Sequence, residues 1–267
     1  MSGLSGSRVL VTGAGSGIGR AIALGACASG ARVAIADIRE EGMQEVAESA
    51  SAAGEIRCFV ADITDLDSVR SLVSGCVDWL GGLDGMVNSA GIISLAHSVD
   101  LGDEELERIL RVNLLGAFRI TREVGRVMLA AGSGSIVEIA SLSSFGAFPG
   151  RLAYSVSKAG VAEMTKTLAA EWGRQGVRVN ALVPGYVHTP LQDGLIARGE
   201  FDVKAIETRT PMGRRAEPED MVGPTLFLLS DASRFVTSHC LVVDGGWLPF
   251  VGPVDKYSGV EPEVAHP

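Results

Sequence analysis

Val9-Leu10-Val11-Thr12 runs directly into Gly13-Ala14-Gly15-Ser16-Gly17-Ile18-Gly19, and Arg20-Ala21-Ile22-Ala23-Leu24 follows. The apolar run predicts a buried strand, the glycines predict a tight turn, and the last segment predicts a helix. Glycines allow the backbone to approach a ligand closely, and a helix N-terminus presents unpaired N–H groups to a pyrophosphate. Strand, glycine turn and helix in this order therefore predict a dinucleotide-binding site.

Short apolar runs alternate with helical patterns along the rest of the chain. The runs that predict strands are Arg8–Thr12, Arg32–Ala36, Ile56–Val60, Gly85–Asn88, Ser135–Ala140, Val177–Leu182 and Cys240–Val243. Because these runs are apolar on both faces, they suit a parallel sheet that helices cover on each side. The sequence predicts one α/β domain, residues 1–247, built as a three-layer, doubly wound, Rossmann-like parallel sheet. Such sheets bind ligands beyond the carboxyl ends of their strands, where the strand order reverses.

Two segments break this alternation. Residues 188–215 carry mixed charge between His188-Thr189-Pro190 and Thr210-Pro211-Met212-Gly213. A long insertion of this kind is usually functional or disordered, and its place after a strand's carboxyl end predicts a lid over the ligand crevice. Residues 248–267 are rich in Pro, Gly and Glu without periodicity, which predicts a C-terminal tail.

The composition excludes several classes of function. At 267 residues and 46% hydrophobic, the chain is long enough to bury a substantial core. A net charge of −9 argues against a nucleic-acid partner, because that binding depends on Lys and Arg. No apolar run approaches the roughly 20 residues of a membrane helix, and no signal-peptide pattern is present, so we expect a cytoplasmic protein without a membrane partner. The four cysteines and four histidines share no ligand spacing, so no metal is expected.

Tyr154 and Lys158 form a candidate acid/base pair. They stand four residues apart in 152–173, a segment that predicts a helix, so they lie one turn apart on the same face. A free tyrosine has a pKa of about 10, and a neighbouring ammonium lowers that pKa by favouring the phenolate. Read singly, Tyr154 could equally be a core aromatic residue and Lys158 a solvated one.

Two carboxylates at predicted strand ends bear on the cofactor. Asp37 lies about 20 residues beyond the glycine turn, where it would accept hydrogen bonds from the adenosine ribose hydroxyls. This predicts NAD rather than NADP, whose 2′-phosphate would meet a like charge, although Arg39 is close by. Asp62 follows the third strand and could line the adenine side or cap the helix that begins near Thr64 and Asp65.

With these residues assembled, the chain resembles the short-chain dehydrogenase/reductase family in its single-domain form of about 250 residues. The resemblance spans about residues 7 to 247. It is carried by Thr12-Gly13-Ala14-Gly15-Ser16-Gly17-Ile18-Gly19, Asp62, Asn88-Ser89-Ala90-Gly91, Asn113, Ser141, Tyr154 with Lys158, and Pro184-Gly185. Ser89 departs from the family, which commonly has a second Asn there. The resemblance implies an NAD-dependent oxidoreductase that interconverts a secondary alcohol and a ketone, assembled as a homotetramer.

The resemblance also implies roles for single residues. Tyr154 would be the general acid/base, Ser141 would hydrogen-bond the substrate oxygen, and Lys158 would bind the nicotinamide ribose while Asn113 holds a water in a proton relay. The residues expected around the dinucleotide are Gly13, Ser16, Gly17, Ile18, Gly19, Asp37, Asp62, Ile63, Asn88, Ala90, Gly91, Tyr154, Lys158, Pro184, Gly185, Val187 and Thr189. Those expected around the substrate are Ser141, Ser143, Arg151, Tyr154 and His188.

The substrate pocket is expected to have a mixed character. Its further walls are expected from Ile92-Ile93-Ser94, Phe145-Gly146-Ala147-Phe148, Tyr186 and the lid. Arg151 and His188 suit a hydroxylated or anionic small molecule, and a similarity to family members favours a sugar or polyol. A 3-oxoacyl thioester reductase is an alternative, against which Asp37 weighs because those members usually prefer NADPH. A dinucleotide-binding regulator without catalysis is a further alternative.

Overall fold

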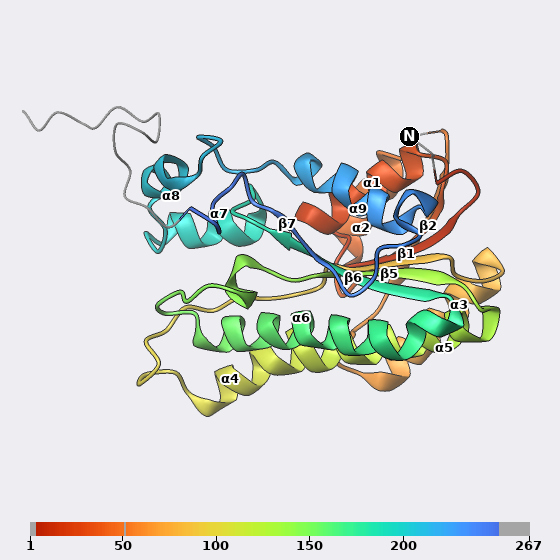
Figure 1. The fold of residues 1–267 in the computed structure, drawn as a ribbon, viewed down its shortest axis with the longest axis horizontal. Coiled ribbons are helices and arrows are strands. Elements are labelled where there is room, and N and C mark those ends of the chain that lie inside the picture. The colour runs from red at the N-terminus through yellow and green to blue at the C-terminus, as the bar shows by residue number, and fades with distance from the viewer. Residues whose placement is uncertain (1–3, 51, 251–267) are drawn as a thin grey trace, which may run out of the picture.

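A parallel β-sheet forms the centre of the computed structural model, which describes residues 4–50 and 52–250. Within these residues the sheet has seven strands in the order β3-β2-β1-β4-β5-β6-β7 (Figure 1). The strands are β1 (Arg8–Thr12), β2 (Arg32–Asp37), β3 (Glu55–Val60), β4 (Gly85–Asn88), β5 (Gly134–Ile139), β6 (Val177–Pro184) and β7 (Cys240–Val243). The predicted doubly wound α/β fold is confirmed, and each strand begins and ends within two residues of its predicted bounds.

Helices cover both faces of the sheet (Figure 1). One face carries α1 (Gly17–Ala28), α2 (Glu40–Glu48) and α9 (Val222–Leu229). The other carries α3 (Leu66–Leu80), α5 (Ala117–Ala131) and α6 (Leu152–Trp172), with α4 (Asp103–Leu110) beside α6. In β1, Val9 and Val11 belong to the core on the first face, whereas Leu10 belongs to the core on the second. This alternation explains why the strands are apolar throughout.

The strand order reverses at β1. The chain runs from β1 to β2 and β3 on one side and then crosses to β4 on the other side of β1. Thr12, at the end of β1, pairs with Ala36 of β2 and with Asn88 of β4. The loops that leave β1 and β4 therefore diverge, which opens a crevice at the carboxyl edge of the sheet.

A π-helical segment, Arg111–Gly116, joins α4 to α5. The sequence predicted helix around 103–131 but not this widened turn. Asn113 lies in the segment and is buried. Segments of this kind occur often at functional sites, because the wider turn changes the direction of the side chains that follow.

Residues 188–215, the predicted lid, contain α7 (Pro190–Ala197) and α8 (Val203–Arg209), which lie beyond one end of the sheet (Figure 1). The buried Arg215 links the two helices, since its guanidinium lies 4.0 Å from Asp193 Oδ1 and 3.7 Å from Glu207 Oε1. Short 3₁₀ segments occupy Leu142–Ser144, Gly173–Gln175, Pro218–Met221 and Asp231–Ser233. Most of the predicted tail, residues 251–267, lies outside the described residues. None of the described helices has the length and apolar character needed to cross a membrane.

Candidate active site

A cavity of about 550 Å³ lies at the carboxyl ends of β1, β2, β4, β5 and β6. Its volume falls within the range usual for small-molecule sites. The predicted residues that line it are Gly13, Ser16, Gly17, Ile18, Asp37, Asp62, Ile63, Ala90, Gly91, Ser141, Arg151, Tyr154, Lys158, Pro184, Gly185, Val187 and Thr189. The predicted residues outside its lining are Gly19, Asn88, Asn113, Ser143 and His188.

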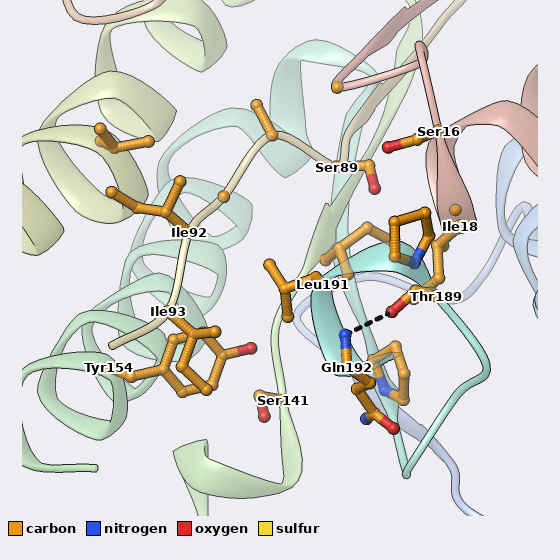
Figure 2. A pocket seen from close by; sticks show the side chains of 18 of the residues that line it. Ser16, Ile18, Ser89, Ile92, Ile93, Ser141, Tyr154, Thr189, Leu191 and Gln192 are labelled. Carbon is orange, nitrogen blue, oxygen red and sulfur yellow. Dashed lines mark hydrogen bonds between the residues drawn. The ribbon is translucent and has the colours of Figure 1, made fainter. Parts of the chain in front are cut away.

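The glycine turn leaves room that side chains would fill. Gly13 has a φ of +63°, and a Cβ there would lie 2.6 Å from the backbone nitrogen of Ala90. A Cβ on Gly19 would clash with the carbonyl of Gly13, so Gly19 serves the packing of the turn against α1. Ser16 stands before α1 and its side chain makes no capping hydrogen bond, and its hydroxyl reaches the cavity wall (Figure 2). Bare backbone at the start of a helix fits a pyrophosphate.

Asp37 is held at the cavity beside this turn. Its carboxylate accepts hydrogen bonds from the backbone N–H groups of Gly15 and Arg39, each at 3.1 Å. Asp62 also lines the cavity, and its Oδ1 accepts a hydrogen bond from the Thr64 N–H at 2.8 Å. The residue that caps α3 is Asp65, whose side chain accepts from Asp67. Asp62 therefore shapes the loop at the cavity and does not cap the helix.

A buried polar chain lies beneath the cavity. Thr12 Oγ1 donates to Asn88 Oδ1 at 2.6 Å, and Asn88 Nδ2 donates to Glu138 Oε2 at 2.8 Å. Thr121 Oγ1 donates to the other Glu138 oxygen. Burial raises the pKa of Glu138 to about 7, against the opposing effects of Thr121, Asn88 and the Lys158 charge. Asn88 thus connects β1 to β5, and its side chain is hydrogen-bonded to Thr12 and Glu138 beneath the cavity where the dinucleotide is expected.

Glu138 was missed by the sequence reasoning. A signal was present, because Glu138 is the charged residue within the apolar run Ser135–Ala140. A carboxyl group is rarely fully buried unless it has partners. Its position in a two-faced strand therefore indicated a polar network at the end of the sheet.

Lys158 is buried at the edge of the cavity, and its Nζ donates to the carbonyl of Ile139 at 2.7 Å. Burial lowers the pKa of Lys158 to about 8, and the carboxyl of Glu138 opposes that shift. Asn113 Oδ1 accepts from the Ile92 N–H, while its Nδ2 donates to the Ile92 carbonyl and to Ser157 Oγ. Asn113 therefore fixes the loop at Ile92 against α6, and its role with a water stays a prediction.

Tyr154 projects its hydroxyl into the cavity, with Ser141 and Ile93 nearby (Figure 2). Burial raises its pKa, opposed by a hydrogen bond with Ser141 and by the positive charge of Arg151. This direction is opposite to the lowering predicted from Lys158. Burial is the larger effect, and Lys158 does not offset it, because its Nζ lies 5.9 Å from the centroid of the Tyr154 ring and is hydrogen-bonded to Ile139 instead.

The substrate end differs from the expectation in detail. Ser143 is buried and its N–H donates to Ser141 Oγ at 3.1 Å, while His188 Nε2 lies 3.7 Å from Glu217. Ile92, Ile93 and Tyr186 line the cavity as expected, but Ser94 and residues 145–148 do not. The lid lines this end as expected, through Leu191, Gln192, Leu195 and Phe201, which sequence reasoning had not named singly, whereas Arg108, Val112 and Leu142 were missed. The spacing of Leu191 and Leu195 on one helical face was the available signal.

Comparisons with known proteins agree with this geometry. A family model described as enoyl-(acyl carrier protein) reductase matches residues 13–248. The chain is 38% identical over 247 residues to a 3-oxoacyl-[acyl-carrier-protein] reductase of Thermotoga maritima, covering 91% of this chain and 98% of the relative. It is 39% identical over 249 residues to a D-threitol dehydrogenase of Mycolicibacterium smegmatis, covering 91% and 94%.

A solved structure from Beutenbergia cavernae, proposed to be an NAD(P)-dependent gluconate 5-dehydrogenase with NADP bound at low occupancy, is also similar. It is 42% identical, has a TM-score of 0.86, and covers 92% of this chain and 98% of its own. The similarity in sequence and the similarity in structure each cover about nine-tenths of this chain. This protein therefore belongs to the short-chain dehydrogenase/reductase family and is an oxidoreductase that acts on CH–OH groups with a nicotinamide dinucleotide.

Proposed function

We propose that this enzyme interconverts a secondary alcohol and a ketone on a sugar or polyol, with NAD(H) as its cofactor. The observation that carries the proposal is the Tyr154 hydroxyl, which faces the cavity together with Ser141, one turn of α6 from the buried Lys158. When bound, the dinucleotide supplies or accepts the hydride. The D-threitol dehydrogenase among its relatives supports a polyol.

The chain's own groups would hold and move the proton. Tyr154 Oη would take the proton of the substrate hydroxyl in oxidation and return it in reduction. Ser141 would hydrogen-bond the same substrate oxygen, and Lys158 would bind the nicotinamide ribose. Burial raises the pKa of Tyr154, which favours the protonated phenol that donates to a ketone, whereas alcohol oxidation would start from the phenolate. Residues 188–215 would act as the lid, since Leu191, Gln192 and Leu195 line the cavity.

The proposal is tested by following NADH formation by absorbance across sugars, polyols, hydroxysteroids and simple cyclic alcohols. We expect the highest kcat/KM within the sugar and polyol group. Strong turnover of a hydroxysteroid and none of any polyol would contradict the substrate class. Tight NAD binding without turnover of any compound would instead favour a regulator that does not catalyse.

Asp37 supports the choice of NAD. We expect Asp37→Ala to raise the ratio of NADP to NAD efficiency by about 10–100-fold. The reason is that the substitution removes a charged acceptor, whose hydrogen bonds are worth about 1.5–3 kcal/mol, and relieves repulsion of the 2′-phosphate. Steady-state kcat/KM with each cofactor measures the ratio.

Glu41→Ala is the matched control, because Glu41 is an exposed carboxylate of α2 that does not line the cavity. Its removal changes the net charge equally and should leave the cofactor ratio unaltered. A wild-type enzyme that uses NADP as well as NAD would overturn the assignment. An Asp37→Ala variant with an unchanged ratio would show that Asp37 does not select the cofactor.

A 3-oxoacyl thioester reductase is the second candidate, favoured by the T. maritima relative. Asp37 weighs against it, since it disfavours NADPH. Reduction of acetoacetyl-CoA with NADPH at a higher kcat/KM than any polyol oxidation would establish this candidate in place of the first.

We also propose a homotetramer that works in the cytoplasm, where the nicotinamide dinucleotide pool is available. Apolar side chains that stay exposed on and beside α5 and α6 support self-association: Leu115, Phe118, Leu152 and Val156 are each at least 39% exposed. Apolar side chains gathered on a helix face in this way are typical of an interaction surface. Sedimentation velocity at micromolar concentration measures the assembly, and a monomer would contradict it.

A further inference from the structure

The cationic side chains that line the cavity are not equivalent. They are Arg39, Arg108, Arg151 and Lys158. Arg39 lies beside Asp37 at the adenosine end, and Lys158 is buried with its Nζ on the Ile139 carbonyl. Arg108 donates to both oxygens of Glu105, at 2.7 Å and 2.8 Å. Among the described residues Arg151, like Arg39, forms no ion pair with a carboxylate, but Arg151 stands three residues before Tyr154, and its charge acts on the Tyr154 phenol.

Arg151 is held among three aromatic rings. Its Cζ lies 4.9 Å from the ring centroid of Phe148, 5.6 Å from that of Tyr186 and 4.5 Å from that of Phe201. Arg151 Nη2 also donates a hydrogen bond to the Tyr186 hydroxyl, with a distance of 3.2 Å between the two atoms. The three rings surround the guanidinium at cation–π distances, and Tyr186 accepts from one of its five N–H groups, so other N–H groups are available to a ligand.

The rings themselves are fixed by packing. Phe148 stacks on Trp247 with centroids 5.3 Å apart, and Tyr186 contacts both Trp247 and Phe201 edge to face, at 5.6 Å and 5.8 Å. They come from three separate segments: the loop before α6, the loop after β6, and the connection between α7 and α8. The guanidinium is therefore preorganised, and a ligand would not have to order it.

Arg151 is the N-cap residue of α6, three residues before Tyr154, and both side chains line the cavity. Residues at i and i+3 are neighbours on a helix surface. The two are close enough that the charge of Arg151 acts on the Tyr154 phenol. A substrate group bound by Arg151 would thus lie only a few bonds from the carbon whose hydroxyl exchanges its proton with Tyr154.

We propose that Arg151 binds the carboxylate of the substrate, so that the enzyme acts on hydroxy acids of the aldonate class in preference to neutral polyols. A guanidinium presents a planar fork that matches a carboxylate with two parallel N–H···O bonds, and apolar rings around it strengthen the attraction by excluding water. This inference rests on the proposed function and names the substrate class of that same site.

The experiment compares D-gluconate with D-glucitol, and D-galactonate with galactitol, as pairs that differ at one end by a carboxylate. In the wild type, the aldonate should have the higher kcat/KM, and its KM should rise with added salt because salt screens the charge pair. Arg151→Gln should lower kcat/KM for the aldonate by about 10–100-fold, mainly through KM, since a hydrogen bond to a charged group is lost. For the alditol, kcat/KM of the variant should stay within about threefold of the wild-type value, when each enzyme is measured at its own pH optimum.

Arg70→Gln is the matched control. Arg70 is exposed, lies on α3 away from the lid, and does not line the cavity. Its removal deletes the same charge and should leave both substrates unaffected. Arg151→Lys keeps the charge without the fork and should give an intermediate KM for the aldonate, which tests the proposal even where Arg151→Gln folds poorly.

If Arg151→Gln lowers kcat/KM equally for the aldonate and the alditol, the inference is overturned. Equal losses would mean that Arg151 only holds α6 against the lid and does not bind a carboxylate. A wild-type preference for the alditol would also overturn it, yet would leave the proposed function intact. Failure of the wild type to oxidise any aldonate, alditol or sugar would refute the proposed sugar or polyol substrate together with it.

Discussion

Replacing Tyr154 with phenylalanine is expected to lower kcat/KM for alcohol oxidation by roughly 10²–10⁴-fold, the contribution typical of positioned proton transfer. The substitution removes the hydroxyl that faces the cavity and keeps the aromatic ring (Figure 2). The phenol would be the acid/base, so its loss should appear in kcat. NADH fluorescence should report an unchanged Kd for the cofactor, and the melting temperature should stay close to that of the wild type.

Tyr186→Phe provides the matched hydroxyl deletion. The Tyr186 hydroxyl also lies at the cavity, but it accepts a hydrogen bond from Arg151 at 3.2 Å. Its removal should cost about 10-fold or less, as expected for one ordinary hydrogen bond. A Tyr154→Phe enzyme with near-wild-type turnover, or equal losses in the two variants, would remove Tyr154 from the role of acid/base.

The fold was predictable because its signals are local and repeated. The glycine turn from Gly13 to Gly19 sits between a strand and a helix, and seven apolar runs alternate with helical patterns, so sequence periodicity alone fixes the class. Strand ends differ from the prediction where pairing between strands extends them. The sixth strand, β6, continues past the predicted Leu182 to Pro184, because its end pairs with β7. The π-helical segment Arg111–Gly116 left no comparable signal, since it depends on tertiary contacts of Asn113 with Ile92 and Ser157.

The site was predictable in its membership more than in its electrostatics. Spacing placed Tyr154 and Lys158 on one helical face, and both line the cavity. Spacing could not show that Lys158 Nζ binds the Ile139 carbonyl, or that burial outweighs nearby charges at Tyr154. Such shifts depend on the dielectric surroundings and on hydrogen-bond directions, which the packed structure determines. Glu138 shows the same limit, because its partners come from β4 and α5, distant in the sequence.

Lys158→Met is expected to have the second large effect, a loss of about 10²–10³-fold in kcat/KM, as for removal of one preorganised donor at a transition state. It should also change the pH dependence of stability, because Lys158 is a cation that acts on the buried Glu138. Thermal or urea unfolding at several pH values, beside steady-state kinetics, measures both effects.

The direction in which stability changes with pH follows from the pKa shifts of Glu138 and Lys158. The pKa of Glu138 is raised from 4.5 to about 7, so the folded state prefers its protonated form and loses stability as pH rises through that interval. The pKa of Lys158 is lowered from 10.5 to about 8, so the folded state regains stability as pH rises above 8. Without Lys158, the pKa of Glu138 rises further and the gain above pH 8 disappears. Lys158→Met should therefore lose stability relative to the wild type between pH 7 and 8.5, by on the order of 1–2 kcal/mol.

The double variant Lys158→Met/Glu138→Gln separates the two effects. Glutamine can still accept one hydrogen bond from Asn88 and donate another to Thr121, but it carries no charge. The extra loss of stability above pH 7 should disappear, while turnover should stay as low as in Lys158→Met, because the ammonium would bind the cofactor ribose directly. Recovery of turnover in the double variant would contradict that role for Lys158. A Lys158→Met stability profile parallel to that of the wild type would show that Lys158 and Glu138 titrate independently.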